Sequence, residues 1–119
     1  EDPNQTIKTL VTVCAKTKEH FVFVVPVNKK LNLKKAANSV GAKSIEMIKA
    51  KELLPLTGYV HGGCSPIGMK KQFKTVIHQS AAEYETIMFS AGKIGYQVEL
   101  PLEYLQKVIP VQVSDIIVE

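Results

Sequence analysis

The segment HFVFVVPV, from His20 to Val27, restricts the possible folds more than any other part of the sequence. It is rich in β-branched and aromatic residues, which are enriched in strands, and it has almost no polar side chain. We therefore predict a buried strand. A membrane-spanning helix needs about 20 apolar residues, and this run, which is the longest and is interrupted by Pro26, is too short to form one. No membrane partner is expected.

A second strand is predicted over Thr6–Ala15, TIKTLVTVCA, which is rich in β-branched residues and alternates between apolar and polar ones. The polar turn KTKE, Lys16–Glu19, separates it from the buried strand. Because the connection is so short, we expect the two strands to pair antiparallel as a hairpin.

Helices are predicted in the middle of the chain. The segment Asn32–Val40 has a capping residue at its start, apolar residues at helical spacing, and Gly41 at its end. A brief helix is expected over Lys49–Leu56, stopped near Pro55. The segment Ser44–Ile48 is ambiguous between a short strand and a helical turn.

Strands predominate in the second half of the chain. The predicted elements are strands at Lys74–Ile77 and Tyr84–Phe89, a turn at Ser90–Gly95, a returning strand at Tyr96–Leu100, a helix at Leu102–Val108 after Pro101, and a final edge strand at Val111–Val118. No βαβ rhythm is visible, so we predict an α+β fold with a curved mixed sheet or a partly closed barrel. A chain of 119 residues suits a single domain.

Basic residues give the chain a net charge of +4, and all 15 of them are lysines. Lysine is a compact point charge that attracts phosphate, whereas arginine supplies the fork used to read bases. The composition favours non-specific contact with a polyanion over sequence-specific readout, and no DNA partner is expected. Solvated lysines are common on any surface, however, so charge alone leaves both interpretations open.

The two cysteines, Cys14 and Cys64, are too few for a disulfide framework and favour a reducing compartment. No basic segment followed by an apolar one opens the sequence, so no signal peptide is predicted and a cytoplasmic location is expected. The sequence also begins without Met, and we expect further residues upstream.

The stretch HGGCSPIGMKK, His61–Lys71, combines a histidine, a thiol, a hydroxyl, three glycines and two lysines. It is not a phosphate-binding P-loop, because Met69 stands where that motif requires lysine and Pro66 removes a backbone donor. It also lacks the final glycine of Gly-x-Ser-x-Gly, the motif around hydrolase nucleophiles. The histidines and cysteines of the chain form no recognised zinc spacing, so neither a metal nor another cofactor is expected.

Other interpretations of this stretch remain open. A nucleophilic Cys64 would need a lowered pKa and a partner base, and His61 is near it in sequence. Alternatively, the glycines allow a sharp turn whose backbone N–H groups bind an anion or serve as an oxyanion hole. A plain structural turn fits the spacing equally well.

Four segments of the sequence resemble a known family. They are QTIKTLV (Gln5–Val11), KKAANSVGAKSIEM (Lys34–Met47), TGYVHGGCSPIGMKKQFKTVI (Thr57–Ile77) and SAGKIGYQVEL (Ser90–Leu100). Together they resemble the YbaK/EbsC family, which is related to the editing domain of bacterial prolyl-tRNA synthetases, and the Gly-Gly-x-Ser-Pro-x-Gly motif is specific to it. Members usually carry an additional N-terminal helix and strand, so residues 1–119 are expected to be a single domain that lacks them.

The resemblance implies a trans-editing hydrolase that deacylates mischarged aminoacyl-tRNA, with Cys-tRNA(Pro) as the expected substrate. It implies a mixed, mostly antiparallel β barrel surrounded by short helices. The expected partners are the acceptor end of the tRNA and prolyl-tRNA synthetase. The alternative is a non-catalytic module of the same fold that only binds tRNA or a synthetase.

The resemblance also implies site residues. Lys8 matches the functional lysine of the family, whose ammonium can hold the terminal phosphate or ribose of the acceptor end. The loop residues Gly62, Gly63, Ser65 and Pro66 match the pocket loop, whose backbone groups can bind the aminoacyl moiety and polarise the ester carbonyl.

A second loop, with Ser90, Gly92 and Lys93, matches residues expected to line the same cleft. His78 departs from the family, whose members commonly have Asp at that position, and this would weaken or retune the site if the Asp contributes to it. Cys64 stands at a variable position, which argues against a nucleophile. We therefore expect no covalent enzyme intermediate, because positioning and oxyanion stabilisation can hydrolyse a reactive ester, with assistance from the thiol of a cysteinyl substrate.

Overall fold

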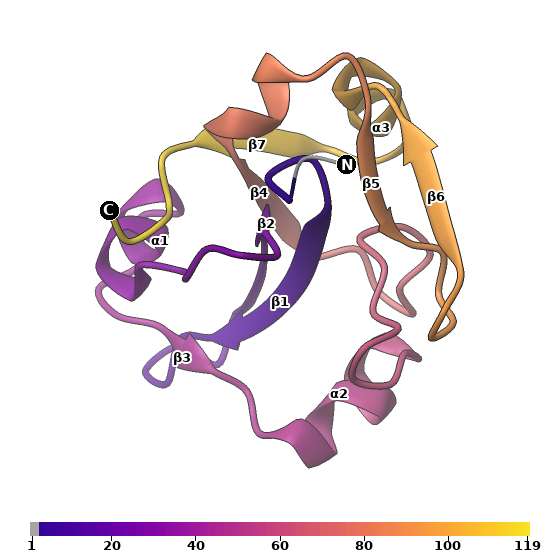
Figure 1. Ribbon diagram of the computed structural model, residues 1–119. Helices are drawn as coiled ribbons and strands as arrows, with labels where there is room; N and C mark the ends of the chain where they lie inside the picture. Colours follow the sequence, from indigo (N-terminus) through magenta and orange to yellow (C-terminus); the bar gives the residue numbers. More distant parts are fainter. Residues whose placement is uncertain (1–2) are drawn as a thin grey trace.

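A five-stranded mixed sheet forms the centre of the structure, a computed structural model that describes residues 3–119 (Figure 1). In spatial order its strands are β3 (Glu46–Met47), β1 (Ile7–Val13), β2 (His20–Pro26), β4 (Lys74–His78) and β7 (Val111–Ser114). β1 pairs antiparallel with β2 and β3, whereas β4 pairs parallel with β2 and β7. The α+β class predicted from the sequence is thereby confirmed.

The predicted hairpin of the first two strands is also confirmed, with Leu10 opposite Phe23 in its register. β2 lies in the middle of the sheet, and every residue from Phe21 to Pro26 is buried. Its side chains alternate between two hydrophobic cores, with Val22 and Val24 in one and Phe23 and Val25 in the other. Burial on both faces explains why this segment has no polar face.

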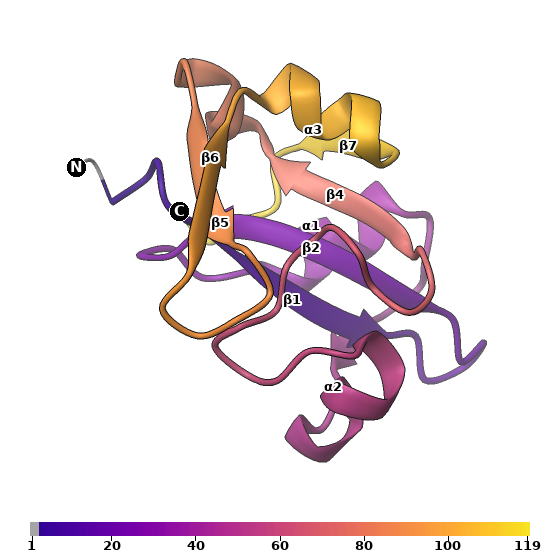
Figure 2. The same ribbon diagram turned by 90° about the vertical axis from the view of Figure 1, so that its right-hand side faces the viewer.

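A separate two-stranded sheet pairs β5 (Ile87–Ser90) with β6 (Gln97–Leu100). Figure 2 shows this hairpin lying across the strands of the larger sheet. Within residues 3–119, a bridge between Thr6 and Met88 is the β-pairing that joins the two sheets. The predicted barrel is not confirmed, because the hairpin pairs at this one point with the residue just before β1 and neither edge of the larger sheet is continued into it.

In the described part of the chain three α-helices accompany the sheets: α1 (Leu33–Ser39), α2 (Ala50–Thr57) and α3 (Leu102–Val108). The side chain of Asn32 accepts a hydrogen bond from the N–H of Lys35 and caps α1 as predicted. α2 does not stop near Pro55 but continues to Thr57, and Gly58 ends it in the left-handed conformation with φ of 88°. Pro55 removes one donor from the helix but does not end it, and the end is set by Gly58, whose N–H donates to the carbonyl oxygen of Leu54.

Some predicted strand boundaries were wrong. A 3₁₀ helix occupies Gln79–Glu83, and β5 begins only at Ile87 instead of at Tyr84. β7 ends at Ser114, since the chain then turns towards α1.

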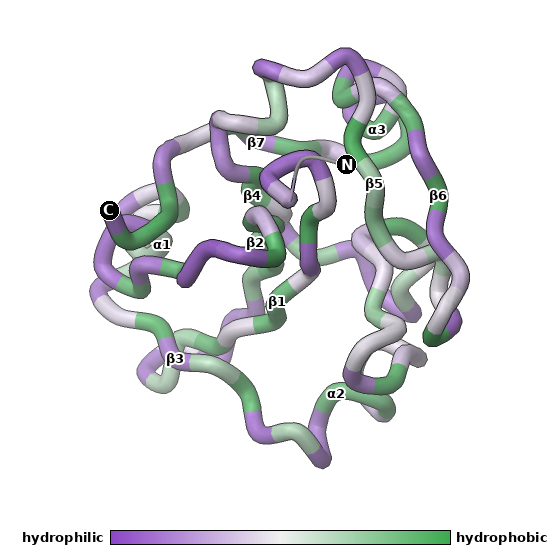
Figure 3. The backbone as a smooth tube through the Cα atoms, in the orientation of Figure 1, coloured by the Kyte–Doolittle hydropathy of each residue, from purple (hydrophilic) through white to green (hydrophobic). Residues whose placement is uncertain are grey.

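The two cores lie on opposite faces of the larger sheet. One is formed between that sheet, the β5–β6 hairpin and α3, and it contains Ile77, Phe89 and Leu105. The other lies against α1 and contains Phe23 and Ile116. Figure 3 shows the lysine-containing connection between β2 and α1 as a hydrophilic stretch. Among residues 3–119, no helix is long and apolar enough to cross a membrane.

The outer edge of β1, on the side away from β2, is paired at its two ends and open between them. At one end, the N–H of Met88 donates to the carbonyl oxygen of Gln5. At the other end, Thr12 pairs with Met47 of β3. In the described part of the chain, no strand pairs with Lys8–Leu10 on this side. This gap in the pairing is where the candidate site lies.

Candidate active site

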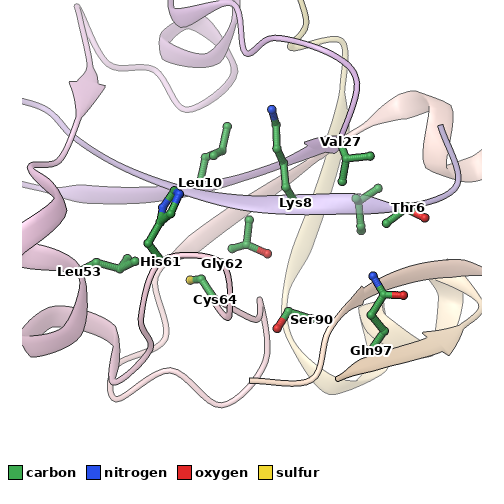
Figure 4. A pocket seen from close by; sticks show the side chains of 12 residues that line it. Thr6, Lys8, Leu10, Val27, Leu53, His61, Gly62, Cys64, Ser90 and Gln97 are labelled. Carbon is green, nitrogen blue, oxygen red and sulfur yellow. The ribbon is translucent and has the colours of Figure 1, made fainter. Parts of the chain in front are cut away.

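A cleft of about 330 Å³ opens beside the unpaired edge of β1 (Figure 4). Four parts of the chain line it: β1 with the residue before it, the residue after β2, α2 with the loop that follows, and the β5–β6 hairpin. The lining residues are Thr6, Ile7, Lys8, Thr9, Leu10, Val27, Leu53, His61, Gly62, Cys64, Ser90 and Gln97. Three of the predicted site residues, Lys8, Gly62 and Ser90, are thus brought to one cleft from segments far apart in sequence.

Lys8 and the glycine loop lie on opposite sides of the β1 edge. Alternate residues of a strand face opposite ways, and Leu10 packs against the core that lies under α1. Lys8 shares that face, and in Figure 4 its side chain extends from β1 away from Gly62 and Ser90. No ion pair joins the Lys8 ammonium to another residue within 3–119. Its charge is therefore available to a ligand that crosses the strand edge.

The glycines of the loop serve two different purposes. Gly62 has φ of 87°, a conformation that favours glycine, and it lines the cleft. Gly63 lies behind it, where an added Cβ would be 3.2 Å from the backbone nitrogen of Ile94. The N–H of Gly63 donates to the carbonyl oxygen of Val60 at 3.0 Å. In this conformation the N–H of Gly63 is engaged in a turn and does not point to a ligand.

Ser65 and Pro66 are buried and do not line the cleft. The Ser65 hydroxyl oxygen accepts a hydrogen bond from the N–H of Ile67 at 3.2 Å, which fixes the turn after the glycines. Both residues thus shape the loop from behind, and their predicted contact with a substrate stays a prediction.

The second predicted loop forms the tip of the β5–β6 hairpin. Ser90 lines the cleft, and its hydroxyl oxygen accepts the N–H of Gly92 at 3.1 Å. Gly92, with φ of 103°, lies against the ring of Tyr59, and an added Cβ would be 3.0 Å from the Tyr59 Cε1 atom. Lys93 follows on the exposed tip, outside the lining of the cleft.

Cys64 lines the cleft, but its environment does not activate a thiol. Burial raises the pKa of Cys64 to about 11, and a hydrogen bond with Thr57 offsets only part of this effect. The thiol is therefore protonated at neutral pH, whereas a nucleophilic cysteine needs a lowered pKa. His61 lines the same cleft but is exposed.

His78 does not belong to the cleft. It lies at the end of β4, where its Nδ1 atom accepts a hydrogen bond of 3.2 Å from the N–H of Ile116. Burial lowers the pKa of His78, and the Asp115 carboxylate opposes that effect. The imidazole is neutral when it accepts this bond, so it joins β4 to the segment after β7. The position at which the sequence was expected to depart from the YbaK/EbsC family, His78 in place of Asp, therefore lies outside the cleft.

Thr9 and Gln97 are among the lining residues that were missed from the sequence. Thr9 shares the face of Ile7 and Val11, and its Oγ1 atom is buried without a hydrogen-bond partner in the described part of the chain. Gln97 lines the cleft from the start of β6. The strand pattern places Thr9 on the core face, but only the position of the hairpin shows that this face becomes a cleft wall.

No group of three or more metal-ligating side chains occurs within residues 3–119. The arrangement instead offers an ammonium, backbone groups, hydroxyls and an amide around a small cleft. Such groups can bind and orient a polar ligand and stabilise negative charge on it.

The amino-acid sequence matches the aminoacyl-tRNA editing domain family over residues 1–108. The chain belongs to the aminoacyl-tRNA editing domain family. This editing domain is also 50% identical, over 102 residues, to a proposed Cys-tRNA(Pro)/Cys-tRNA(Cys) deacylase of Enterococcus faecalis, EbsC. The match covers 86% of this chain and 62% of the relative, so the editing domain spans less than two thirds of that protein.

Solved structures support the fold of the editing domain. A proposed trans-editing enzyme for prolyl-tRNA synthetase superposes with a TM-score of 0.87 at 24% identity, covering 99% of this chain and 73% of the other. A scaffold protein used for computational grafting of epitope backbones gives a TM-score of 0.90 at 22% identity, covering 99% and 74%. At these identities the likeness establishes the fold alone.

Proposed function

We propose that this editing domain hydrolyses the ester bond between an amino acid and the 3′ end of a mischarged tRNA, with Cys-tRNA(Pro) as its preferred substrate. One observation carries the proposal: a single cleft collects Lys8, Gly62 and Ser90 in a chain of the aminoacyl-tRNA editing domain family. The relative named as a Cys-tRNA(Pro)/Cys-tRNA(Cys) deacylase supports the choice of substrate.

The chemistry of the cleft suits the end of an aminoacyl-tRNA. Its volume of about 330 Å³ is at the small end of ligand pockets, which span about 300 to 1,000 Å³, and it fits an amino acid with its ribose better than a longer chain. We expect the Lys8 ammonium to contact the terminal phosphate or ribose. The glycine loop and Ser90, across the β1 edge, surround the aminoacyl group.

Hydrolysis in this cleft proceeds by positioning and charge stabilisation. The ester carbonyl lies against the loop, where backbone N–H groups stabilise the oxyanion that forms when the carbonyl is attacked. Because the N–H of Gly63 is engaged with Val60, the oxyanion donors are expected among the N–H groups of the two loop residues that flank it and line the cleft, Gly62 and Cys64. With its pKa near 11, the Cys64 thiol is not the nucleophile.

The attacking group is a water molecule or the thiol of a cysteinyl substrate. In the second route the substrate sulfur bonds to its own carbonyl carbon, the ester C–O bond breaks, and the thiol proton passes to the ribose oxygen. Water then opens the cyclic thioester and releases cysteine. The protein only orients the substrate in this route. Part of the specificity for cysteine then comes from the substrate thiol itself, because an amino acid without a thiol cannot react in this way.

The alternative is a module that binds tRNA without turnover. The engaged N–H of Gly63 favours it, because one of the expected oxyanion donors is unavailable in this conformation. This module would bind tRNA with an affinity that falls steeply with salt, and it would release no amino acid.

The deciding experiment is a deacylation assay with Cys-tRNA(Pro), Ala-tRNA(Pro) and correctly charged Pro-tRNA(Pro), with and without prolyl-tRNA synthetase. The proposal expects release of cysteine at a rate well above spontaneous hydrolysis and little release of proline. A requirement for the synthetase would identify it as the partner that selects the tRNA. If tRNA binds but no charged form is hydrolysed faster than in buffer, the alternative function, tRNA binding without turnover, is correct.

A further inference from the structure

The tip of the β5–β6 hairpin, residues 91–96, stands at the rim of the cleft. Ser90 and Gln97, which precede and follow the tip, both line the cleft. Ile94 lies against Gly62, where an added Cβ would be 3.7 Å from the Ile94 Cγ1 atom. Figure 2 shows the tip beside the loop that follows α2. A ligand that enters the cleft past the glycine loop therefore passes the tip.

The tip exposes apolar surface at this rim. Ile94 and Tyr96 are 67% and 64% exposed, the largest values among the large hydrophobic side chains of residues 3–119. The ammonium of Lys93 lies 5.8 Å from the centre of the Tyr96 ring. The described ion pairs involve Lys35 and His78, so within residues 3–119 no carboxylate compensates the charge of Lys93.

Hydrogen bonds within the backbone define the turn that carries these side chains. The N–H of Ala91 donates to the carbonyl oxygen of Tyr96 at 2.9 Å, and the N–H of Tyr96 donates to that of Lys93 at 3.1 Å. Gly92, packed on Tyr59, anchors the tip to the loop after α2. Tyr96 is thus an exposed aromatic ring on a turn of defined backbone, where it is accessible to a ligand.

We infer that the tip is a stacking platform for the unpaired nucleotides just upstream of the 3′ end held in the cleft. The Tyr96 ring stacks on a base, and Lys93 contacts the adjoining phosphate. Aromatic stacking binds single-stranded nucleic acid without regard to sequence, and an uncompensated lysine at the same place complements the phosphate charge. The inference rests on the proposed function, because it takes the 3′ end of a tRNA as the occupant of the cleft.

The chain contains a matched control. Tyr104 on α3 is 55% exposed, and the ammonium of Lys107 lies 5.4 Å from its ring centre. The pair has the same chemistry as Tyr96 with Lys93, yet neither residue lines the cleft. Stacking at the rim therefore predicts that replacing Tyr96 weakens RNA binding and replacing Tyr104 does not. Non-specific binding of RNA to any exposed Tyr–Lys pair predicts equal losses of affinity.

The test measures binding of an uncharged acceptor-stem RNA hairpin that ends in the single-stranded nucleotides CCA, and of the same hairpin without them. Tyr96→Ala is expected to weaken binding of the first RNA about five- to tenfold, with Tyr96→Phe and Tyr104→Ala close to wild type. Lys93→Gln should reduce the slope of log affinity against log salt by about 0.7. The blunt hairpin should not distinguish the variants. Equal binding by Tyr96→Ala and wild type, or an equal loss in Tyr104→Ala, would overturn the inference.

A second substrate separates this inference from the proposed function. Cysteinyl-adenosine has the ester but no upstream nucleotide, so Tyr96→Ala should hydrolyse it at the wild-type rate while its KM for Cys-tRNA(Pro) rises. A wild-type protein that hydrolyses neither substrate refutes the proposed function, and the RNA-binding comparison still decides the role of the tip. Because Tyr96 is mostly exposed, its replacement should leave thermal unfolding unchanged.

Discussion

The hydroxyl of Tyr59 donates a hydrogen bond of 2.5 Å to the carbonyl oxygen of Ile67. This bond ties the start of the glycine-rich loop to its far side. The same ring packs on Gly92 at the tip of the β5–β6 hairpin. Tyr59 thus connects the two loops that flank the cleft.

The contact between Gly92 and Tyr59 can be tested with two glycine variants. Gly92 and Gly95 both have positive φ, so alanine costs about 1 to 2 kcal/mol at each position. Only at Gly92 does the added Cβ also meet the Tyr59 ring, at 3.0 Å, whereas Gly95 has open space. In urea unfolding, we expect Gly92→Ala to lower the free energy of unfolding by about 1 kcal/mol more than Gly95→Ala does. Equal losses would mean that the ring does not press on the tip.

Replacement of Lys8 should reduce deacylation without affecting the fold. Lys8 forms no ion pair within residues 3–119, so Lys8→Ala should change the free energy of unfolding by less than about 0.5 kcal/mol. Deacylation of Cys-tRNA(Pro) should fall at least about tenfold, because a charged contact to the substrate is lost. Lys16→Ala, in the exposed turn before β2, is the control. Full activity in Lys8→Ala would remove Lys8 from the site.

Cys64 should be dispensable for chemistry. With a pKa of about 11, about one thiol in a thousand is ionised at pH 8, so iodoacetamide should modify Cys64 far more slowly than a free cysteine. Cys64→Ala should keep deacylation within about threefold of wild type, after allowance for any loss of stability. A fall of a thousandfold in kcat in a folded variant would identify Cys64 as a nucleophile.

Acid should destabilise the protein through His78. Burial lowers its pKa in the folded state, so the unfolded chain takes up a proton near the usual pKa of 6.5 while the folded protein does not. Stability is therefore complete above this pH and declines as the pH falls through it. Urea unfolding at pH 7.5 and 5.5 should show this decline in wild type and a smaller one in His78→Asn.

His61→Asn is the control for that measurement, because His61 is exposed and makes no comparable bond. It should show the same decline as wild type. If His78→Asn retains the full pH dependence, other groups are responsible for it.

Local features of the fold could be predicted from the sequence. The hairpin of Thr6–Ala15 with His20–Val27, the cap at Asn32 and the helix at Leu102–Val108 depend on neighbouring residues, which the sequence pattern displays. The parallel pairing of β2 with β4 could not be inferred, because those strands are separated by about fifty residues of helix and loop. The predicted barrel is not confirmed for a similar reason, since closure depends on how the β5–β6 hairpin meets β1.

The site was predictable by resemblance only in part. Lys8, Gly62 and Ser90 share a cleft, whereas Gly63 packs against the backbone of Ile94 behind it. Glycine permits a positive φ in one position and a close backbone approach in the other, and the sequence alone does not distinguish these uses.

The open segment of β1 also bears on how the protein avoids unwanted association. An unpaired strand edge is a template on which a strand from another molecule can add, and this leads to aggregation. Here the exposed stretch is limited to Lys8–Leu10, and it is closed off by the Met88 bridge on one side and by β3 on the other. An incoming strand would find few partners, while a small ligand still finds backbone groups to bind. The editing domain can keep a reactive edge exposed because that edge is too short to seed a larger sheet.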